Sequence, residues 1–514
     1  MKSFELVLTP EEAYNDHALK QLLAKKEGVE ASAISTIIIR HRSIDARKAV
    51  KVLVKLDVAF DGETIDIPGE KFCFEKLSDS AKQVVIVGSG PAGLFAALRL
   101  LQHGVKPIVV ERGKPVEDRN RDIALLNRNE AFDPESNYAF GEGGAGTYSD
   151  GKLYTRSTKR GDINRILSLF HFFGADSNVL FEAHPHIGTD KLPAIVKAMR
   201  NLIEEKGGEF LFSKKVTALN IHNQKVCSVV THDGQEIKAD ALIWASGHSA
   251  TDNYRMLHES GLLLQAKGFA LGVRIEHQQE LINTIQYGKK YSKLLPPARY
   301  FISHQVQGRG VYSFCMCPGG IIVPALTQSK TMVVNGMSNS KRNSRFANAG
   351  LVVEIKPEDI EGSDVFKCLD FQQHVEAMAY TNGGGDMIAP AQALSDFMNG
   401  KISTQLPESS YHPGIVSSPV HFWLPEFIST RLREALRVFS KKMPGFVTND
   451  AIAVAVESRT SSPVRIIRDT DTFQSPAVEA FFPCGEGSGY SGGIVSSAID
   501  GDVSAQKIIE YLKL

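Results

Sequence analysis

The sequence predicts an α/β protein built around one open parallel sheet, together with a mixed α/β domain and a small N-terminal α+β module. Three observations predict this architecture. An apolar run leads into regularly spaced glycines early in the chain. A strand-rich segment with an Asp-Gly turn interrupts the helices that follow. Near the carboxyl end, another apolar run leads into an acidic residue flanked by glycines.

The first of these features is the apolar run Val84–Val87, which enters glycines at the spacing G-x-G-x-x-G. Such a run is typical of a buried parallel strand, and the glycines open a helix directly after it. Gly88 permits the tight turn, Gly90 lets the backbone approach a pyrophosphate, and Gly93 allows the helix to pack closely on the strand. Phosphates bind there because unpaired N–H groups and the positive end of the helix dipole converge.

The segment after the glycines supports a nucleotide site. A helix is expected from Leu94 to Gly104, and a second apolar strand, 107–110, follows it. This strand ends on Glu111, about 20 residues past the glycines, where an acid accepts the ribose hydroxyls of an adenosine. Because strand, helix, strand and acid occur together, the spacing favours a nucleotide site over a glycine turn that binds nothing.

Length predicts more than one domain, since 514 residues are too many for a single core. We expect the nucleotide-binding domain to be split by a cap domain that carries the substrate. The expected ranges are 1–80 for the N-terminal module, 81–265 and 450–514 for the two parts of the nucleotide-binding domain, and 266–449 for the cap.

Composition excludes several classes of partner. Lys plus Arg (58) balances Asp plus Glu (58), so no overall field attracts nucleic acid or anionic lipid, and nucleic acid is not an expected partner. The start of the chain has no signal-peptide core, and no run of about 18 apolar residues predicts a membrane span. Six cysteines in so long a chain do not indicate a disulfide framework. We therefore expect a cytoplasmic protein without a membrane partner and without a metal site.

The N-terminal module is predicted to be a small βαββ layer. Strands are expected at Phe4–Leu8, Ser35–Arg40 and Val50–Phe60, and a helix at His17–Lys26. A linker around Glu75–Gln83 joins this layer to the main body.

A basic patch lies between two of these strands and consists of Arg40, His41, Arg42, Arg47, Lys48 and Lys51. Two interpretations remain open. A solvated turn is favoured because charged runs usually lie at the surface and no aromatic platform interrupts this one. Contact with RNA or another protein is the alternative.

The stretch Phe140–Lys152 is unusually rich in glycine. Such a loop suits a backbone that passes close to a flat or phosphorylated ligand. The alternative is a flexible surface loop, but the interleaved Ala145, Thr147 and Tyr148 favour ligand contact.

A strand-rich crossover is expected next. A helix capped by Asp190 and ended by Gly207 comes first. Short strands are predicted at 209–213, 216–221, 226–231 and 236–238, the last two joined by an Asp-Gly turn. The apolar strand Asp240–Ala245 then rejoins the main sheet and closes on Gly247 and His248.

The remainder is predicted to be a cap and a return to the first domain. Short strands with scattered Pro and Gly from about Lys267 to Thr448 indicate a mixed α/β cap. At the carboxyl end, the strand beginning at Phe481 leads to Glu486, and a final helix begins near Gly492 and Gly493.

These features favour FAD as the cofactor. A single acidic ribose partner and a single glycine fingerprint account for one adenosine only, and Glu486 suits the ribityl hydroxyls of a flavin. The helix near Gly493 would direct its positive end at the flavin pyrimidine edge, which gains negative charge on reduction. Glu111 would also repel a 2′-phosphate, which disfavours NADP at this site.

The chain resembles the bacterial FAD-dependent dehydrogenases, two-dinucleotide-binding-domain flavoproteins related to the electron-transfer flavoprotein–ubiquinone oxidoreductases and the aminoacetone oxidase-like proteins. The segments that carry the resemblance are Val84–Leu94, Gly141–Leu153, Ala241–Gly247 and Pro483–Gly493. Its most specific runs are Gly-Glu-Gly-Gly-Ala-Gly-Thr, Cys-Met-Cys-Pro-Gly-Gly and Glu-Ser-Arg-Thr-Ser-Ser-Pro. The predicted fold is then a Rossmann-like FAD-binding domain with a strand-rich crossover, a mixed α/β cap and the N-terminal module.

The resemblance implies a set of FAD contacts: Gly88, Gly90, Gly93, Glu111, Arg112, Gly143, Gly144, Val216, Gly485 and Glu486. The glycine turn and the strand and helix ends add Pro91, Ala92, Gly247, Gly492 and Gly493. The chain departs from the related families in two ways. Glu486 stands where many flavoproteins have Asp, and the cysteine quartet of the ubiquinone oxidoreductases is missing, which argues against a quinone-reducing role at a membrane.

Two arginines are candidates for substrate chemistry. Arg459 and Arg465 would clamp a substrate carboxylate or stabilise anionic flavin, with Glu457 orienting a guanidinium. A structural ion pair between cap and flavin domain is an equally supported interpretation.

Other candidates are two thiols and a histidine. Cys315 and Cys317 alternate, so on a regular strand both would point to one face, either as a redox-active pair or as buried core thiols. His248 follows a strand end at the cofactor, either as a proton donor or, as we favour, as a hydrogen-bonded structural residue. Lys152 and Tyr154 are weaker candidates of the same kind.

The sequence therefore predicts an FAD-dependent oxidoreductase, specifically a dehydrogenase. It would transfer reducing equivalents between a small-molecule substrate and an external electron donor or acceptor, either NAD(P)H or a protein. Two alternatives remain: an RNA-modifying flavoprotein that uses the N-terminal module, and a non-enzymatic flavin redox sensor.

Overall fold

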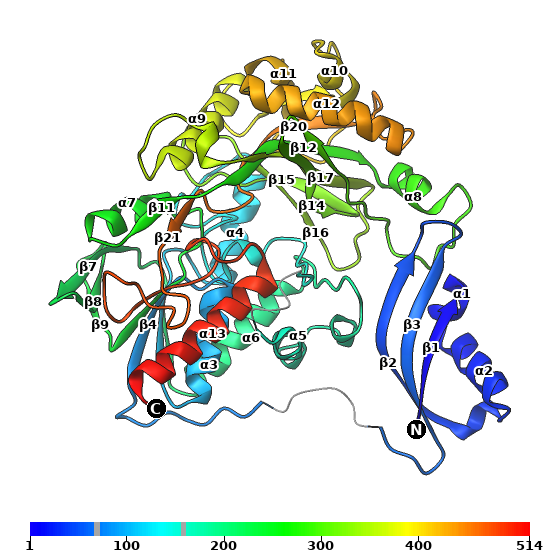
Figure 1. The fold of residues 1–514 in the computed structure, drawn as a ribbon, viewed down its shortest axis with the longest axis horizontal. Helices are drawn as coiled ribbons and strands as arrows, with labels where there is room; N and C mark the ends of the chain where they lie inside the picture. Colours follow the sequence, from blue (N-terminus) through cyan, green and yellow to red (C-terminus); the bar gives the residue numbers. More distant parts are fainter. Residues whose placement is uncertain (66–71, 156–160) are drawn as a thin grey trace.

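The computed structural model describes residues 1–65, 72–155 and 161–514. Figure 1 shows the N-terminal module beside the main body, a parallel sheet with its helices below, and a second domain above it. This arrangement confirms the predicted α/β fold.

The N-terminal module is a three-stranded antiparallel sheet in the order β1-β3-β2, with one face covered by a helix. Its elements are β1 (Lys2–Leu8), α1 (Pro10–Ala13), α2 (Asp16–Glu27), η1 (Ala31–Ala33), β2 (Ile34–Asp45) and β3 (Lys51–Phe60). The alternating residues Val52, Val54 and Leu56 of β3 are buried, as are Leu19 and Leu23 of α2, and they form one core. Alternation with period two thus produced the predicted βαββ layer.

The module docks on the main body through Arg42. The Arg42 N–H donates to the Phe181 carbonyl (2.9 Å), and the Ala183 N–H donates to the Arg42 carbonyl (2.9 Å). The guanidinium of Arg42 lies 2.5 Å from Glu182 Oε1. It also lies over the ring of Tyr14, 4.5 Å from the centroid. One arginine therefore joins backbone pairing, an ion pair and a ring contact.

Other arginines of the basic patch are paired within the module. Arg40 Nε lies 2.7 Å from Asp57 Oδ2, and Arg47 Nη2 lies 2.6 Å from Asp45 Oδ2. Arg47 lies in the exposed turn between β2 and β3, but Arg40, His41 and Arg42 belong to strand β2, so the predicted solvated turn is wrong for these three residues.

The main sheet has five parallel strands in the order β22-β10-β4-β5-β6. The strands are β4 (Gln83–Val87), β5 (Lys106–Val110), β6 (Glu209–Leu211), β10 (Ala241–Trp244) and β22 (Phe481–Pro483). The helices of this domain are α3 (Pro91–Gln102), α4 (Val116–Asn127), η2 (Gly144–Gly146), α5 (Ile163–Phe172), η3 (Ser177–Leu180), α6 (Leu192–Glu205), α7 (Thr251–Glu259) and α13 (Ile494–Leu512). No helix of the described residues is long and apolar enough to cross a membrane.

The crossover is a separate antiparallel sheet of β7 (Val216–His222), β8 (Lys225–Thr231) and β9 (Glu236–Lys238). The strand expected at 209–213 does not belong to it. That segment forms β6, which pairs in parallel with β5 at the edge of the main sheet. A further two-stranded sheet joins β11 (Leu264–Ala266) to β21 (Val464–Ile466).

The second domain is a seven-stranded sheet in the order β13-β14-β17-β12-β20-β18-β19, with helices above it (Figure 1). Its strands are β12 (Phe269–Gln278), β13 (Ser303–Val306), β14 (Arg309–Cys317), β17 (Phe346–Ile355), β18 (Ala389–Ala393), β19 (Ile415–Ser417) and β20 (Ile452–Glu457), and a hairpin adds β15 (Gly320–Pro324) and β16 (Val334–Ser338). Its helices are α8 (Gln279–Tyr287), η4 (Pro357–Asp359), α9 (Lys367–Asn382), α10 (Leu394–Asn399), α11 (Val420–Trp423) and α12 (Glu426–Lys442).

Strand β20 lies on the cap side of the boundary that we drew at 449/450. It pairs with β12 and β18, so Ile452–Glu457 belongs to the seven-stranded sheet and not to the FAD-binding domain. The sequence alone could not assign this strand, because its apolar run is equally compatible with the main parallel sheet and with the seven-stranded sheet.

Replacing Arg42 with Ala should loosen the N-terminal module, because Glu182 would then be left half-buried without its cation. We expect hydrogen exchange at the Ala183 amide, which bonds to the Arg42 carbonyl, to accelerate several-fold. Arg47→Ala is the matched control, since Arg47 is 89% exposed and pairs only within its own turn. Unchanged exchange at Ala183 in the Arg42 variant would contradict this docking role.

Candidate functional site

A cavity of about 1390 Å³ lies between the FAD-binding sheet and the second domain. It opens beyond the carboxyl ends of β4, β10 and β5, since Val87, Ala245 and Val110 line it. Ligands of open α/β sheets bind at this edge. The cavity exceeds the roughly 300–1,000 Å³ of ordinary small-molecule pockets, so it has room for a large cofactor together with a substrate.

The glycines of the turn have two roles: two of them allow close backbone packing, and one leaves space for a ligand. A Cβ on Gly88 would lie 2.4 Å from the Ala245 carbonyl oxygen, and one on Gly93 would lie 2.0 Å from the Gly88 carbonyl oxygen. Both glycines therefore permit close backbone packing, and Gly93 does not line the cavity. Gly90 does line it, and a Cβ there would meet nothing nearer than 3.9 Å. Its missing side chain keeps cavity space open.

Two helices begin at this cavity without a side-chain cap. Pro91 and Ala92 at the start of α3, and Gly492, Gly493 and Ile494 at the start of α13, all line it. Unpaired N–H groups and a positive dipole end are thus available at both places. Two such ends suit a ligand that carries phosphate at one position and gains negative charge at another.

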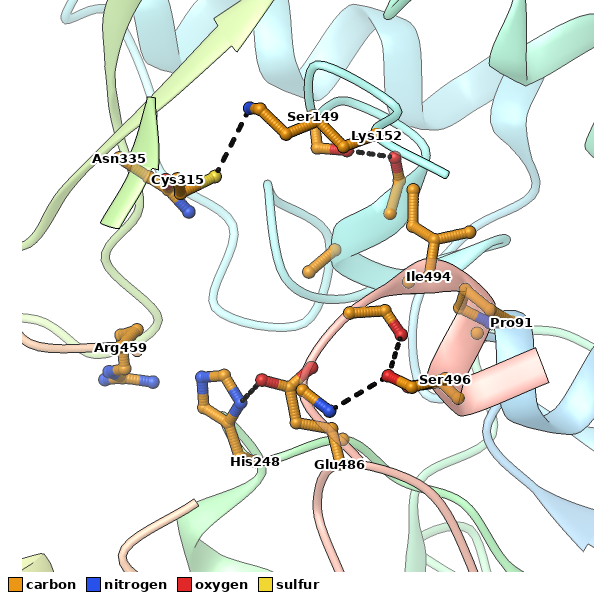
Figure 2. A pocket seen from close by; sticks show the side chains of 18 of the residues that line it. Pro91, Ser149, Lys152, His248, Cys315, Asn335, Arg459, Glu486, Ile494 and Ser496 are labelled. Atoms are coloured by element: carbon orange, nitrogen blue, oxygen red, sulfur yellow. Dashed lines mark hydrogen bonds and ion pairs between the residues drawn. The ribbon is translucent and has the colours of Figure 1, made fainter. Parts of the chain in front are cut away.

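The glycine-rich loop brings the two helix starts together. A Cβ on Gly146 would lie 3.3 Å from Pro91 Cγ and 3.4 Å from Ile494 Cγ1. Figure 2 shows Pro91 and Ile494 side by side at the cavity. Thr147 and Tyr148 are buried, so the loop is packed in place, unlike the flexible surface loop that was the alternative.

Two glycines that we predicted as FAD contacts in this loop differ in role. Gly143 has φ +78° and its N–H donates to the Ser89 carbonyl (3.0 Å), but it does not line the cavity. Gly144 lines the cavity and would carry a Cβ only 3.1 Å from Gly90 Cα. Gly143 shapes the loop, and Gly144 faces the ligand space.

Glu111 lines the cavity but is already fully hydrogen-bonded. Oε2 accepts from the Ser89 N–H (2.9 Å) and hydroxyl (2.7 Å), and Oε1 accepts from the N–H groups of Gly113 (2.9 Å) and Gly141 (3.0 Å). A carboxylate offers about four acceptor sites, so ribose hydroxyls would have to replace one of these donors. The Ser89 hydroxyl is the one that can rotate away. Glu111 therefore also ties the glycine turn to the glycine-rich loop.

Arg112 lies next to Glu111 and forms part of the same end of the cavity. Its guanidinium lies over the Phe140 ring, 4.0 Å from the centroid, and pairs with Asp252 (3.0 Å) and Glu135 (2.5 Å). Val216, which the resemblance implied as an FAD contact, also lines this cavity. The side chains offer a flat cationic surface of the kind that stacks on aromatic rings.

Near the start of α13, Glu486 faces His248. Oε1 of Glu486 lies 3.2 Å from Nδ1 of His248 (Figure 2). Both residues line the cavity, as does Gly247. Gly485 does not line it; its N–H donates to Asp500 Oδ2 (2.7 Å). Asp500 is in turn paired with Arg468 (2.6 Å), a buried ion pair that the sequence reasoning missed.

The two predicted arginines are placed differently. Arg459 lines the cavity, and Glu376 accepts from its Nε (2.7 Å) and its Nη2 (2.9 Å). Among the described residues, Nη1 of Arg459 has no hydrogen-bond partner. Arg465 does not line the cavity, and its guanidinium lies 5.5 Å from the centre of the Tyr490 ring. The predicted two-arginine clamp at the substrate is therefore wrong in respect of Arg465.

Glu457 is a structural partner of a third arginine. Its Oε2 lies 3.0 Å from Nη1 of Arg274, on the neighbouring strand β12, and both side chains are buried outside the cavity lining. Burial raises the pKa of Glu457 to about 7. It does not orient Arg459 or Arg465 as predicted. No sequence pattern indicated Arg274 or Glu376, because strand pairing and helix packing bring them to these partners from distant segments.

Cys315 and Cys317 lie at a bulge and not on the regular strand that we predicted. The register of β14 against β17 shifts between Phe314 and Cys317, and Cys315 has φ +46°. Lys152 Nζ lies 3.7 Å from Cys315 Sγ and 3.5 Å from Cys317 Sγ. Cys315 lines the cavity, whereas Cys317 is buried. Both thiols still face one lysine, which comes from the glycine-rich loop. Figure 2 shows the contact between Lys152 and Cys315.

This environment separates the two thiols. The hydrogen bond from the Cys317 thiol, together with the charges of Lys152 and Arg274, lowers the pKa of Cys315 to about 6. The same hydrogen bond and burial raise the pKa of Cys317. Cys315 is therefore the thiol that ionises at neutral pH. Among the described residues, no group of three or more His, Cys, Asp or Glu side chains is placed to hold a metal ion.

Comparison with known proteins agrees with this organisation. A family model described as "FAD binding domain" matches residues 81–126, which include the glycine turn and Glu111. One described as "FAD-dependent protein, C-terminal domain-like" matches 268–460, and a domain of unknown function (DUF8436) matches 1–61. An uncharacterized protein of Clostridium beijerinckii is 40% identical over 518 residues, covering 97% of each chain. The chain belongs to the family of that protein.

Its cofactor is FAD. The 268–460 match ends after β20, which agrees with the corrected position of that strand. Solved structures with detectable likeness include the tetracycline destructase Tet(51) (10% identity, TM-score 0.33, 84% of this chain and 82% of that one) and the halogenase PltM (10%, 0.39, 84% and 70%). Both TM-scores are low, so the family assignment rests on the sequence matches.

The ionisation of Cys315 can be measured through its alkylation. The pKa of Cys315 is lowered, so the thiolate is present above about pH 6, and the iodoacetamide reaction rate in the holoprotein should rise with a midpoint there. Lys152→Met should move the midpoint to higher pH because it removes a neighbouring cation.

The surface substitution Lys197→Met serves as the control, since Lys197 pairs only with Glu117. A midpoint near the ordinary thiol value of about 8.5, unchanged in the Lys152 variant, would contradict this electrostatic account.

Proposed function

We propose that the protein is an FAD-dependent oxidoreductase, a dehydrogenase, that transfers reducing equivalents between a small-molecule substrate and an external donor or acceptor. The observation that carries the proposal is that both uncapped helix starts open into one cavity, and that this cavity continues to Arg459, His248 and Cys315. FAD supplies two-electron chemistry when bound, and the side chains around it would position the substrate and move protons.

The residues at the cavity fit FAD from end to end. The open space at Gly90 and the start of α3 would hold the pyrophosphate. Arg112 would face the adenosine, with the Ser89 hydroxyl giving way at Glu111. The start of α13 at Gly493 would face the electron-accepting end of the cofactor.

Two side chains are candidates for proton and charge handling. His248 would carry a proton, because Glu486 holds its Nδ1 and so fixes the ring at the cavity wall. Arg459 would present its unpaired Nη1 to a developing negative charge, because Glu376 holds the other guanidinium nitrogens.

We also propose three more specific points: kinship with the electron-transfer flavoprotein–ubiquinone oxidoreductases, a cytoplasmic location, and NAD(P)H or a protein as the external electron partner. RNA modification is less favoured, because three of the six residues of the basic patch, Arg40, Arg42 and Arg47, are paired with carboxylates. A non-enzymatic redox sensor keeps some support from the ionisable Cys315 at the cavity.

Gly90→Ala tests the cofactor site. Gly90 has φ −69°, and an added Cβ finds space in the protein, so the fold should persist while the methyl group occupies ligand space. We expect FAD affinity to fall by about 10-fold or more, equivalent to about 1.4 kcal/mol. Gly310→Ala, on strand β14 of the second domain, where an added Cβ would have its nearest neighbour at 3.6 Å, should retain FAD. Equal FAD occupancy in both variants would contradict the site.

Turnover is tested by anaerobic stopped-flow reduction of the bound flavin, screened over NADH, NADPH and small carboxylate and amine donors. The oxidoreductase proposal expects bleaching by at least one donor and steady turnover once an acceptor is added. Partner binding that depends on the redox state of the flavin, without turnover by any pair, would favour the sensor instead.

A further inference from the structure

One part of the cavity lining, which we call the cationic arm, consists of Lys152, Arg299, Arg342, His184, Tyr154 and Phe301. Lys152 also contacts Cys315, and the other five residues have no role in the flavin site described above. Three of its residues are permanent cations. The acidic residues among the described cavity lining are Glu111, Asp150 and Glu486, and only Asp150 belongs to this arm.

The charges of the arm do not balance. Asp150 is buried and accepts from Nε (3.2 Å) and Nη2 (2.6 Å) of Arg342, and it lies 3.4 Å from Lys152 Nζ. Lys152 Nζ also lies 3.7 Å from the ionisable Cys315 Sγ, so Asp150 and this thiol together face Lys152 and Arg342, and the third cation, Arg299, is left over. Burial opposes ionisation of Asp150, but the charges of Lys152 and Arg342 hold its pKa well below the ordinary value.

Arg299 is the unbalanced cation. It has no hydrogen-bond or carboxylate partner among the described residues, yet it lines the cavity. Surrounding protein atoms and the nearby charge of Arg342 lower the pKa of Arg299 to about 10, which still leaves it charged at neutral pH. Because Arg299 is exposed, water solvates its guanidinium in the free protein, and a ligand anion in the cavity would replace that water with charge-assisted hydrogen bonds.

The histidines of this region stay neutral and so do not add to the repulsion. Burial, followed by the charges of Arg299 and Arg342, lowers the pKa of His184 to about 4. His184 Nδ1 is buried and has no hydrogen-bond partner among the described residues, so this ring nitrogen is available to bond to a ligand. The segment that carries His184 is held by the backbone pairing of Ala183 with Arg42 of the N-terminal module.

The arm also has aromatic side chains in its lining. Tyr154 and Phe301 are 50% and 60% exposed and both line the cavity. The Tyr154 ring lies 4.6 Å from the His184 ring. A flat apolar ligand body would cover these surfaces and place an oxyanion at the guanidinium groups.

We propose that the cationic arm binds the substrate, and that the substrate is an organic oxyanion, a carboxylate or phosphate monoester carried on an aromatic or other flat apolar body. Arg299 clasps the oxyanion as a bidentate donor, and Lys152 and Arg342 add positive charge. This inference rests on the proposed function, because it names the substrate class of the same cavity.

The test measures binding to the FAD-loaded protein by isothermal titration calorimetry and by flavin absorbance difference spectra. The probes are benzoate, phenyl phosphate, neutral benzamide, inorganic phosphate and NADPH. We expect benzoate or phenyl phosphate to bind and benzamide and inorganic phosphate to bind much more weakly. Benzoate as the better probe assigns a carboxylate, and phenyl phosphate assigns a phosphate monoester.

Arg299→Gln should weaken binding of the preferred probe by about 10- to 100-fold without changing FAD content. Arg299→Lys should recover part of the loss, and Arg345→Gln is the surface control, since Arg345 is 63% exposed and pairs with Glu408. Equal binding of benzoate and benzamide, no loss in Arg299→Gln, or binding of NADPH alone would overturn the proposal. Calorimetry measures anion binding without flavin reduction. A protein that binds the anion but is reduced by no donor would therefore count against the proposed function and not against the substrate class inferred here.

Discussion

Helix α13 packs against α3 through Gly501, where a Cβ would lie 2.0 Å from the Ala92 carbonyl oxygen. This backbone contact joins the last helix of the chain to the first helix of the FAD-binding domain (Figure 1). The glycine-rich loop then holds the two helix starts together at Gly146. Without this close approach the two positive helix ends would not face one cavity, and the site would lose the feature on which the flavin assignment depends.

Buried ion pairs support the second-domain side of the cavity, where Arg459 is the one of their residues that lines it. Arg274 with Glu457, and Arg459 with Glu376, are ion pairs inside the second domain. Removing one member of such a pair leaves an uncompensated buried charge, so these pairs fix the geometry of the strands that carry them. The difference among the cavity arginines is then informative. Arg459 has a dedicated carboxylate, whereas Arg299 has no such partner among the residues that the structure describes.

Much of the fold could be predicted from local sequence. The strand, glycine turn and helix at 84–104 follow from apolar period and glycine geometry, and the N-terminal layer follows from alternation in Val52, Val54 and Leu56. Pairing partners could not be predicted, because they depend on which segments the sheets bring together. β20 therefore went to the wrong domain, Glu457 was assigned the wrong arginine, and the bulge at Cys315 replaced a regular strand. No sequence pattern indicated Arg299, because its lack of a carboxylate partner among the described residues can be seen only in the folded structure.

The central claim is that FAD lies between the starts of α3 and α13. The most direct measurement is a crystal structure of the FAD-loaded protein. The account predicts the pyrophosphate over Gly90, the isoalloxazine ring at Gly492 and Gly493, and the ring facing Arg459 and His248 across the cavity. A flavin bound elsewhere, or one whose ring lies away from the start of α13, would contradict it.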